Sequence, residues 1–422
     1  MHSTSLCPAA QQQRRANIKM MKLHLTVILS SEKSICACYH VTNFDRITSQ
    51  NMHEFMSERN AFMIASNDEQ QGSDCPVFDG MWEYVCLYSG ATIDAARALL
   101  NDQSNIAINW SGGLHHAKKK AASGFCYIND IVLAIIMMLK YKQRVLYIDI
   151  DVHHGDGVEQ AFWSTDRVMT LSFHKYDPEN FFPGTGGMLD TGPDSLDNPG
   201  AHYSLNVPLD DGITDEQYTD LFQDIVKNVM EKYRPEAVVL QCGADSLGGD
   251  RLGRFNLNIR AHGACVDFMK AKCGTSIPLL ILGGGGYTPR NVARTWTHET
   301  ALCVGADFPT NMKVPEHVPY RMAFEGGERG DGLMFPKLDT PRLRHVNANT
   351  EQKLSLLKQN ILEQLRYVQS APSVQMQWMP KDFAKVREDV DKALQDEKDE
   401  RERDEAGRRR KERNTGARGE YR

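Results

Sequence analysis

The sequence predicts a single-domain α/β protein, in which a central, mostly parallel sheet carries helices on both faces and an active site at the carboxyl ends of its strands. Between residues 74 and 304, short apolar runs alternate with amphipathic stretches of helical periodicity, the pattern of a parallel sheet wrapped by helices. Polar, glycine-rich or titratable residues follow nearly every apolar run. Because the carboxyl ends of parallel strands share one edge of a sheet, we expect the chemistry to gather there.

The candidate strands are short and rich in aliphatic residues, as expected of parallel strands that are buried on both faces. They span residues 106–110, 145–149, 168–173, 237–241 and 278–282. The longest apolar run, residues 131–139, is far shorter than the roughly 18 residues that a membrane span requires, so we expect a buried helix there and no membrane association.

The two ends of the chain differ from the middle. Residues 1–73 show weak periodicity and predict a divergent amino-terminal part of a catalytic domain, whether complete or truncated, and residues 74–380 predict the body of that domain. Residues 381–422 contain 14 Lys or Arg and 13 Asp or Glu with almost no aromatic residues. Such a segment cannot bury enough apolar surface to fold alone, so we expect a charged tail that is helical or disordered.

Composition narrows the class of protein. A net charge of −6 and a pI near 6.2 give no global reason to bind nucleic acid. The ten cysteines include no Cys-x-x-Cys pair, which favours reduced thiols in a nuclear or cytosolic protein. The basic cluster at residues 408–411 is either a nuclear-entry signal or a plain solvated segment.

The segment Asp149-Ile-Asp-Val-His-His-Gly-Asp156 follows the predicted strand 145–149 directly and holds three carboxylates and two imidazoles. If the strand continues, side-chain alternation puts Asp149, Asp151 and His153 on one face. Carboxylate oxygens and a neutral imidazole suit a divalent metal ion, zinc especially. The alternative is a hydrogen-bonded polar cap on a strand without a ligand.

A catalytic zinc ion needs about three protein ligands and an open coordination position. Asp151 and His153 supply two, and Asp245, which follows the predicted strand 237–241, is the best-placed third. A water activated by the metal also needs a proton acceptor, which adjacent histidines in a glycine loop could provide. These are His115 and His116, and Asp149 and Asp156 are the carboxylates that could set their tautomers and basicity.

Two further loops border the same predicted edge. Tyr287 follows four glycines, and its phenol could donate a hydrogen bond to a developing oxyanion. A glycine run of this kind could instead cradle phosphate, but neither a following Lys-Ser/Thr nor the dinucleotide fingerprint accompanies it. Phe125, Phe181 and Phe182 lie beside glycine or proline in loops, so they either belong to the core or line a narrow apolar slot.

Six segments together resemble the successive motifs of class I zinc-dependent histone deacetylases. They are Gly112-Gly-Leu-His-His-Ala-Lys-Lys, Ser123-Gly-Phe-Cys-Tyr-Ile-Asn-Asp, Asp149-Ile-Asp-Val-His-His-Gly-Asp-Gly, Phe181-Phe-Pro-Gly-Thr-Gly, Cys242-Gly-Ala-Asp-Ser-Leu and Gly283-Gly-Gly-Gly-Tyr. The resemblance covers residues 74–305 in order. Residues 371–377 and the charged tail most resemble fungal members related to histone deacetylase 3.

The resemblance implies the arginase-deacetylase fold and a defined reaction. That reaction is zinc-dependent hydrolysis of the acetyl amide of N6-acetyl-lysine on histone tails, giving lysine and acetate, in transcriptional corepression. The resemblance implies that zinc is bound by Asp151, His153 and Asp245, and that His115 and His116 act as acid and base, supported by Asp149 and Asp156. It implies that Tyr287 polarises the acetyl carbonyl. It also implies a substrate tunnel lined by Gly124, Phe125, Phe182 and Leu252, with Asp74 binding the substrate backbone.

The resemblance also implies further ligands and partners. A structural potassium ion is expected at Asp149, Asp151, His153, Ser172 and Phe173, partly through backbone oxygens. An inositol phosphate is expected at Arg251 and Arg290, because guanidinium groups suit bidentate phosphate contacts. The expected partners are acetylated histone tails and corepressor subunits, without direct sequence-specific nucleic-acid binding, in the nucleus and secondarily the cytoplasm.

The amino terminus departs from the family pattern. Members open with a strand and a Gly-His-Pro-Met-Lys-Pro-type loop, whereas residues 20–25 show only a faint likeness and the first strand is predicted to be absent. Two alternatives to a zinc-dependent deacetylase remain open. One is a binuclear manganese ureohydrolase of the same fold, which needs more carboxylates than Asp151 and Asp245 offer. The other is a catalytically impaired scaffold of a corepressor complex.

Overall fold

The computed structural model describes residues 36–38, 74–193, 198–318, 321–325 and 332–369. In this part of the chain, one seven-stranded sheet has the order β1-β2-β7-β6-β3-β4-β5, and every neighbouring pair is parallel. The predicted α/β class is therefore confirmed. The strands are β1 (Cys36–Cys38), β2 (Ile106–Asn109), β3 (Val145–Asp149), β4 (Val168–Lys175), β5 (Ser204–Leu209), β6 (Ala237–Gln241) and β7 (Leu279–Leu282).

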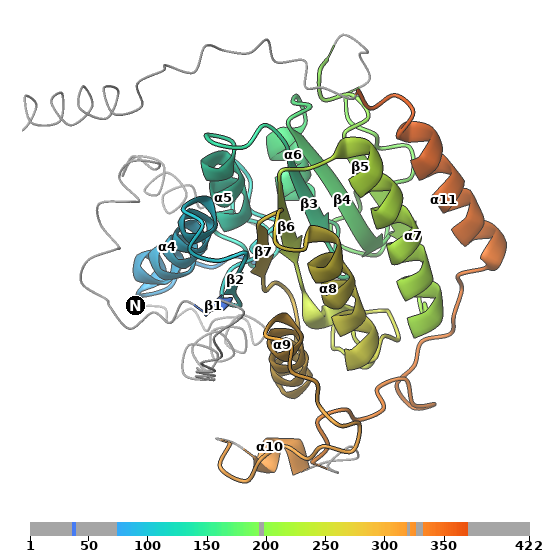
Figure 1. The fold of residues 1–422 in the computed structure, drawn as a ribbon. Helices are drawn as coiled ribbons and strands as arrows, with labels where there is room; N and C mark the ends of the chain where they lie inside the picture. Colours follow the sequence, from blue (N-terminus) through green and yellow to red (C-terminus); the bar gives the residue numbers. More distant parts are fainter. Residues whose placement is uncertain (1–35, 39–73, 194–197, 319–320, 326–331, 370–422) are drawn as a thin grey trace, which may run out of the picture. The chain divides into compact units, whose positions relative to one another are not determined.

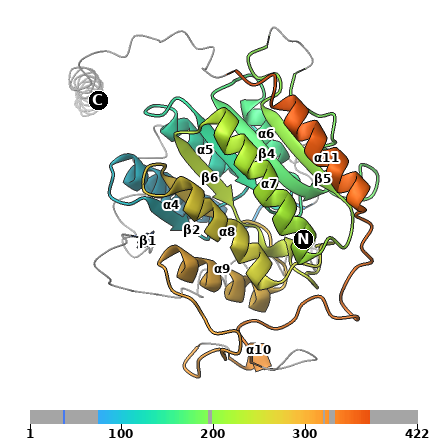
Figure 2. The ribbon, with the colours of Figure 1, turned by 45° about the vertical axis from the view of Figure 1, so that its right-hand side comes forward.

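Helices cover both faces of the sheet (Figure 1). Side chains alternate along β3, so Leu146 and Ile148 pack in one buried cluster and Val145 and Tyr147 in another. The first cluster includes residues of α7, α8, α9 and α11, and Figure 2 shows α7, α8 and α11 in front of the strands. The helices are α4 (Met81–Leu100), α5 (Asp130–Met138), α6 (Asp156–Phe162), α7 (Asp215–Tyr233), α8 (Ile259–Cys273), α9 (Pro289–Cys303), α10 (Met322–Glu325) and α11 (Glu351–Gln364), with the short 3-10 helix η1 (Ala244–Ser246).

The predicted strands appear within one or two residues of their expected bounds, but two edge strands were missed. The strand β1 pairs in parallel with β2, whereas the first strand that was predicted to be absent would precede residues 20–25, which lie outside the described residues. At three residues, β1 is too short to stand out as an apolar run. The strand β5 carries Asn206 and Pro208, which interrupt its apolar pattern. A proline is tolerated there because β5 pairs only with β4 in the described sheet, leaving its other side free of ladder bonds.

The helix prediction can be compared with the structure, whereas several predictions for the two ends of the chain cannot. The buried helix expected at 131–139 is α5, which Asn129 caps by accepting a hydrogen bond from the Val132 amide. None of the helices among the described residues is long and apolar enough to cross a membrane. Three of the predicted features lie outside the part that the structure describes: the segment 20–25, the boundary between residues 380 and 381, and the charged tail at residues 381–422.

The register of the strands places the ends of β3, β6 and β7 next to one another. Asp149 at the end of β3 pairs with Gln241 at the end of β6 and with Ser172 on β4. Gln241 in turn pairs with Leu282, the last residue of β7. The loops after β3, β6 and β7 therefore begin side by side, as parallel strands require.

Candidate active site

Three buried side chains converge where the loops after β3 and β6 meet. Asp151, His153 and Asp245 each offer one ligand atom, and these atoms all lie within 4.8 Å of one another. His153 Nδ1 lies 3.1 Å from Asp151 Oδ1 and 3.0 Å from Asp245 Oδ2. One imidazole nitrogen and two carboxylate oxygens are a donor set that fits a divalent metal ion.

The electrostatics of the three groups also fit a cation. Burial, together with the negative charge of Asp151, raises the pKa of Asp245 to about 7. Burial alone would raise the pKa of Asp151 as well, but the positive charge of His115 and the hydrogen bond from His153 hold it well below its usual range. Two carboxylates this close repel each other when both are ionised, and a bound cation relieves that repulsion.

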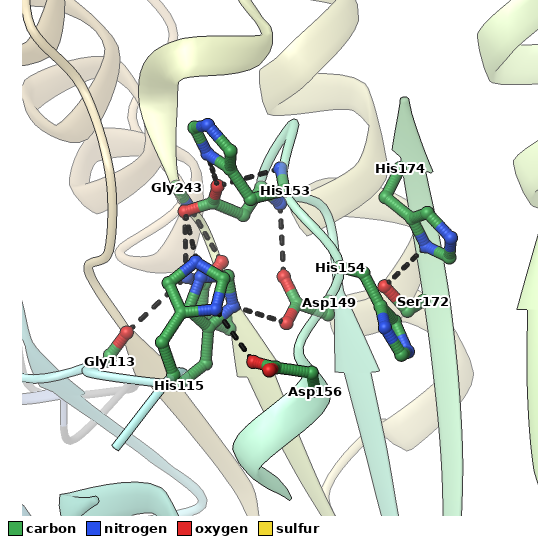
Figure 3. A network of polar contacts seen from close by, with 12 residues as sticks. Gly113, His115, Asp149, His153, His154, Asp156, Ser172, His174 and Gly243 are labelled. Atoms are coloured by element: carbon green, nitrogen blue, oxygen red, sulfur yellow. Dashed lines mark hydrogen bonds and ion pairs between the residues drawn. The ribbon is translucent and has the colours of Figure 1, made fainter. Parts of the chain in front are cut away.

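Asp149 does not belong to this group of three. The strand ends at Asp149, so the regular alternation stops there. Its Oδ2 instead accepts hydrogen bonds from His115 Nδ1 at 2.7 Å and from the Tyr147 hydroxyl at 2.5 Å. Figure 3 shows His115 facing Asp149 from a separate loop.

His116 has a matching partner in Asp156, at the first residue of α6. The distance from His116 Nδ1 to Asp156 Oδ1 is 2.8 Å, and Lys118 Nζ lies 2.9 Å from Asp156 Oδ2. In both pairs Nδ1 is engaged, which leaves Nε2 of each ring available for proton exchange. Sequence reasoning missed Lys118, although it lies in the Gly112-Gly-Leu-His-His-Ala-Lys-Lys motif.

The two histidines differ in the directions of their pKa shifts. Burial would lower the pKa of His115, but the charges of Asp149 and Asp151 outweigh burial and raise it to about 9. Burial and the positive charge of His115 lower the pKa of His116 to about 3, despite the hydrogen bond to Asp156. The ring centroids lie only 3.9 Å apart, so protonation of one ring disfavours protonation of the other.

The loop that carries both histidines is held by Asp130, at the start of α5. Its carboxylate accepts hydrogen bonds from the amides of Gly113 and Leu114, both at 2.9 Å. Gly113 has a φ of +94°, and a Cβ there would lie 2.2 Å from the carbonyl oxygen of Gly283, so only glycine fits. Sequence reasoning also missed Asp130, because nothing local links it to a loop 16 residues earlier.

Aromatic side chains border the metal group. Phe181 stacks on His153, with ring centroids 5.1 Å apart and an angle of 7°. Phe182 makes an edge contact with His116 at 4.8 Å between centroids, and its side chain is 43% exposed. Phe125 and Tyr287 form a second edge contact at 6.0 Å. Of the predicted slot residues, Phe181 and Phe182 therefore lie beside the histidines and Phe125 lies beside Tyr287.

Asp250 connects the two remaining loops of the site. One of its oxygens accepts a hydrogen bond from the Leu252 amide at 3.0 Å, and the other accepts one from the Tyr287 amide at 2.7 Å. Leu252 itself is 42% exposed. Burial, followed by the charges of Asp245 and Asp151, raises the pKa of Tyr287 well above its usual value. Tyr287 therefore keeps its phenolic proton and can act as a donor.

The remaining predicted residues have different surroundings. Asp74 is partly buried and accepts a hydrogen bond from the Gly124 amide at 2.7 Å. A Cβ on Gly124 would lie 2.4 Å from the His116 ring, so this loop approaches the histidine too closely for any other residue. Arg251 is exposed in the loop after η1, and Arg290 is partly buried in the first turn of α9.

The two expected potassium ligands on β4 also have partners. Ser172 Oγ lies 2.9 Å from His174 Nδ1, as Figure 3 shows. The Phe173 ring is buried against Tyr218 and Phe222. Only the backbone oxygen of Phe173 could therefore contact an ion.

Comparison with known proteins agrees with this geometry. A family model described as the histone deacetylase domain matches residues 12–303. The chain is 50% identical over 336 residues to histone deacetylase 1 of Homo sapiens, Bos taurus and Rattus norvegicus, a match covering 80% of this chain and 64% of each relative. It therefore spans less than two thirds of the length of these relatives. On the strength of both matches, the chain belongs to the histone deacetylase family.

Proposed function

We propose that the protein is a class I, zinc-dependent lysine deacetylase. It hydrolyses the acetyl amide of N6-acetyl-lysine on histone tails, releasing lysine and acetate, and acts in transcriptional corepression. The observation that carries the proposal is the convergence of Asp151, His153 and Asp245 beside two histidine–aspartate pairs. Family membership supports the same reaction.

Asp151, His153 and Asp245 would hold the zinc ion. When bound, zinc supplies Lewis acidity that polarises a carbonyl and makes water more acidic. Because the pKa of His116 is lowered to about 3 in the metal-free protein, this ring is neutral at pH 7, and its Nε2 would have a lone pair with which to accept a proton. The pKa of His115 is raised to about 9 in the metal-free protein, so this ring would be the candidate acid that assists departure of the amine.

Tyr287 would donate its phenolic hydrogen to the oxygen of the acetyl carbonyl as negative charge develops there. Gly124, Phe125, Phe182 and Leu252 would form the wall along which the lysine side chain enters. The exposed edges of Phe182 and Leu252 suit the aliphatic stem of that side chain. Asp74, which already fixes the Gly124 amide, would hold the substrate backbone at the rim.

The test of this function combines metal analysis with turnover. Purified protein should release acetate from an acetylated histone-tail peptide, and a zinc chelator should abolish the release. Asp245→Ala should lower zinc content as well as turnover, because it removes one of three ligands. Full zinc occupancy in Asp245→Ala would remove this residue from the metal site. Full zinc occupancy without turnover in the unmodified protein would instead favour the catalytically impaired scaffold.

Two further ligands belong to the same proposal. A structural potassium ion would use Asp149, Asp151, His153, Ser172 and the backbone of Phe173. An inositol phosphate would bind Arg251 and Arg290, and we expect weak regulation because the amino-terminal sequence departs from the family pattern. Strong activation by inositol tetraphosphate that is lost in Arg251→Ala would show that this departure is harmless.

The cellular role is proposed on the same basis. Acetylated histone tails and corepressor subunits are the expected partners, and the nucleus is the expected compartment, with the cytoplasm second. Within the family, residues 371–377 and the charged tail favour the fungal members related to histone deacetylase 3.

A further inference from the structure

We propose that Gln241 is a positioning residue that joins the two halves of the metal centre. The inference rests on the metal site proposed above and assigns a role to a side chain outside the ligand set. Gln241 is the last residue of β6 and is fully buried. Its Nε2 donates to Asp151 Oδ2 at 2.9 Å, and its Oε1 accepts from the Gly243 amide at 2.8 Å. One amide therefore contacts a candidate ligand in the loop after β3 and the turn that carries Asp245.

On the Asp151 side, the amide fixes the direction of a ligand carboxylate. Asp151 Oδ2 accepts a second hydrogen bond, from the Gly285 amide at 2.8 Å. Asp151 Oδ1 is the oxygen that lies 3.1 Å from His153 Nδ1. Two donors on Oδ2 oppose rotation of the carboxylate, so Oδ1 stays directed toward the other ligands.

On the Asp245 side, the amide fixes the backbone of a short turn. The Gly243 carbonyl accepts a hydrogen bond from His262 Nε2 at 2.9 Å, so side chains hold both polar groups of this residue. The Cys242 carbonyl accepts a hydrogen bond from Trp296 Nε1 at 2.9 Å. The turn is therefore anchored on either side of Gly243, and its geometry determines where Asp245 points.

The amide lies close against the backbone of the site. A Cβ on Gly284 would lie 2.1 Å from Gln241 Nε2, and a Cβ on Gly243 would lie 2.0 Å from Asp151 Oδ2. Two glycines thus allow the amide and the carboxylate to approach the backbone this closely. A converse link runs from the β3 loop, since the Val152 amide donates to Asp245 Oδ1 at 2.9 Å. The two ligand loops hold each other.

The chemistry of the amide explains why glutamine suits this position. It offers a donor to the carboxylate and an acceptor to the backbone amide from one planar group. Glutamate has the same shape but would present a second buried anion to Asp151. Methionine has a similar length and volume but would leave the Gly243 amide and one lone pair of Asp151 without these partners. Both substitutions should loosen the metal ligands while the strand itself remains buried.

Metal affinity measured without substrate tests the inference. Substitution of a group that orients a metal ligand typically lowers metal affinity by about 10- to 100-fold, and we expect a loss in this range for Gln241→Met. We expect Gln241→Glu to change both the zinc affinity and the cobalt spectrum, because glutamate cannot donate to Asp151 Oδ2 and adds a negative charge beside the ligands. The measurement is competition with a chelator for zinc, together with the visible spectrum of the cobalt-substituted protein, which reports ligand geometry. With zinc restored in excess, kcat should remain lowered while KM for the peptide stays near its original value.

Gln364 offers a matched control. Like Gln241 it is a buried glutamine with a hydrogen-bonded side-chain amide, but it lies away from the metal group. Its Nε2 donates to the Ser204 carbonyl at 2.7 Å, on the α11 side of the sheet. Gln364→Met should cost stability but leave zinc affinity and the cobalt spectrum unchanged. Unchanged affinity and spectrum in folded Gln241→Met would overturn the inference. If that variant does not fold, the same result in Gln241→Glu overturns it. Absence of turnover in the unmodified protein would contradict the proposed function alone.

Discussion

The pairs His115–Asp149 and His116–Asp156 have the same residue types and nearly the same hydrogen-bond length, yet the pKa values of their histidines move in opposite directions. The distances are 2.7 and 2.8 Å. The pKa of His115 is raised to about 9, and the pKa of His116 is lowered to about 3. The hydrogen bond within each pair therefore does not decide which ring carries the proton.

The difference comes from the second neighbours of each pair. His115 Nε2 lies 3.9 Å from a second carboxylate, that of Asp151, which stabilises a positive ring. His116 instead lies beside the positive charge of His115, and its own partner Asp156 is shared with Lys118. Two similar His–Asp pairs can thus hold one neutral and one charged ring.

The largest expected effect is the loss of kcat when each of the two histidines is substituted in turn. His116→Asn removes the neutral acceptor and should lower kcat by about a thousand- to ten-thousandfold, the upper range for general acid–base catalysis. His115→Asn removes the ring proposed as the acid and should lower kcat by about a hundredfold, the lower end of the same range. Rates are compared on one acetylated peptide with zinc content checked in each variant. Equal losses would show that the two rings share both roles.

Tyr287 differs from both histidines because its raised pKa keeps its phenolic group protonated at neutral pH. Tyr287→Phe retains the ring and removes only the hydroxyl, so it should lower kcat by about a hundred- to a thousandfold, or roughly 3 to 4 kcal/mol. Peptide binding should persist, because the donor acts mainly in the transition state. A loss below about tenfold, under roughly 1.4 kcal/mol, would leave Tyr287 as a wall residue only.

The metal-free protein should show the opposite pKa shifts directly. Because the folded pKa of His115 is about 9, above the unfolded value of about 6.5, its contribution to stability is full below pH 6.5 and is lost as pH rises through 9. The folded pKa of His116 is about 3, so its contribution is full above pH 6.5 and is lost as pH falls through 3. Each is on the order of a few kcal/mol.

Imidazole nitrogen shifts of the two rings, followed by NMR with His115→Asn and His116→Asn for assignment, check this expectation. Added zinc should lower the pKa of His115, because a cation bound at Asp151 offsets the negative charge that favours its proton. Two titrations with the same midpoint would contradict the proposed difference between the pairs.

The smallest expected effect concerns Lys118. Its side chain is 39% exposed, so solvent screens the ion pair and we expect less than about 1 kcal/mol from it. Lys118→Met should raise the pKa of His116 by a fraction of a unit, because Asp156 then interacts with this ring alone. The acid limb of the pH profile of kcat/KM should move upward. Lys119→Met, at an exposed neighbouring position, is the control, and an equal movement there would exclude a specific role for Lys118.

Much of the site could be predicted because its candidate residues lie in short motifs directly after apolar runs. Val145–Asp149 and Ala237–Gln241 are apolar runs with polar ends, so their strands and the residues that follow them were predicted correctly. Asp151, His153 and Asp245 could be grouped because parallel strands align their carboxyl ends. The strands β1 and β5 were missed because one is very short and the other carries a proline.

The sequence by itself thus determined five strands of the sheet, the types of the candidate ligands and the family resemblance, since these depend on periodicity and on residues adjacent in the chain. Only the tertiary structure decided which groups hold the site in place. Asp130, Lys118 and Gln241 contact residues between 16 and 90 positions away, and no local pattern records such contacts. The opposite pKa shifts of His115 and His116 were also decided there, because burial and charge–charge interactions depend on distances in space rather than on spacing along the chain.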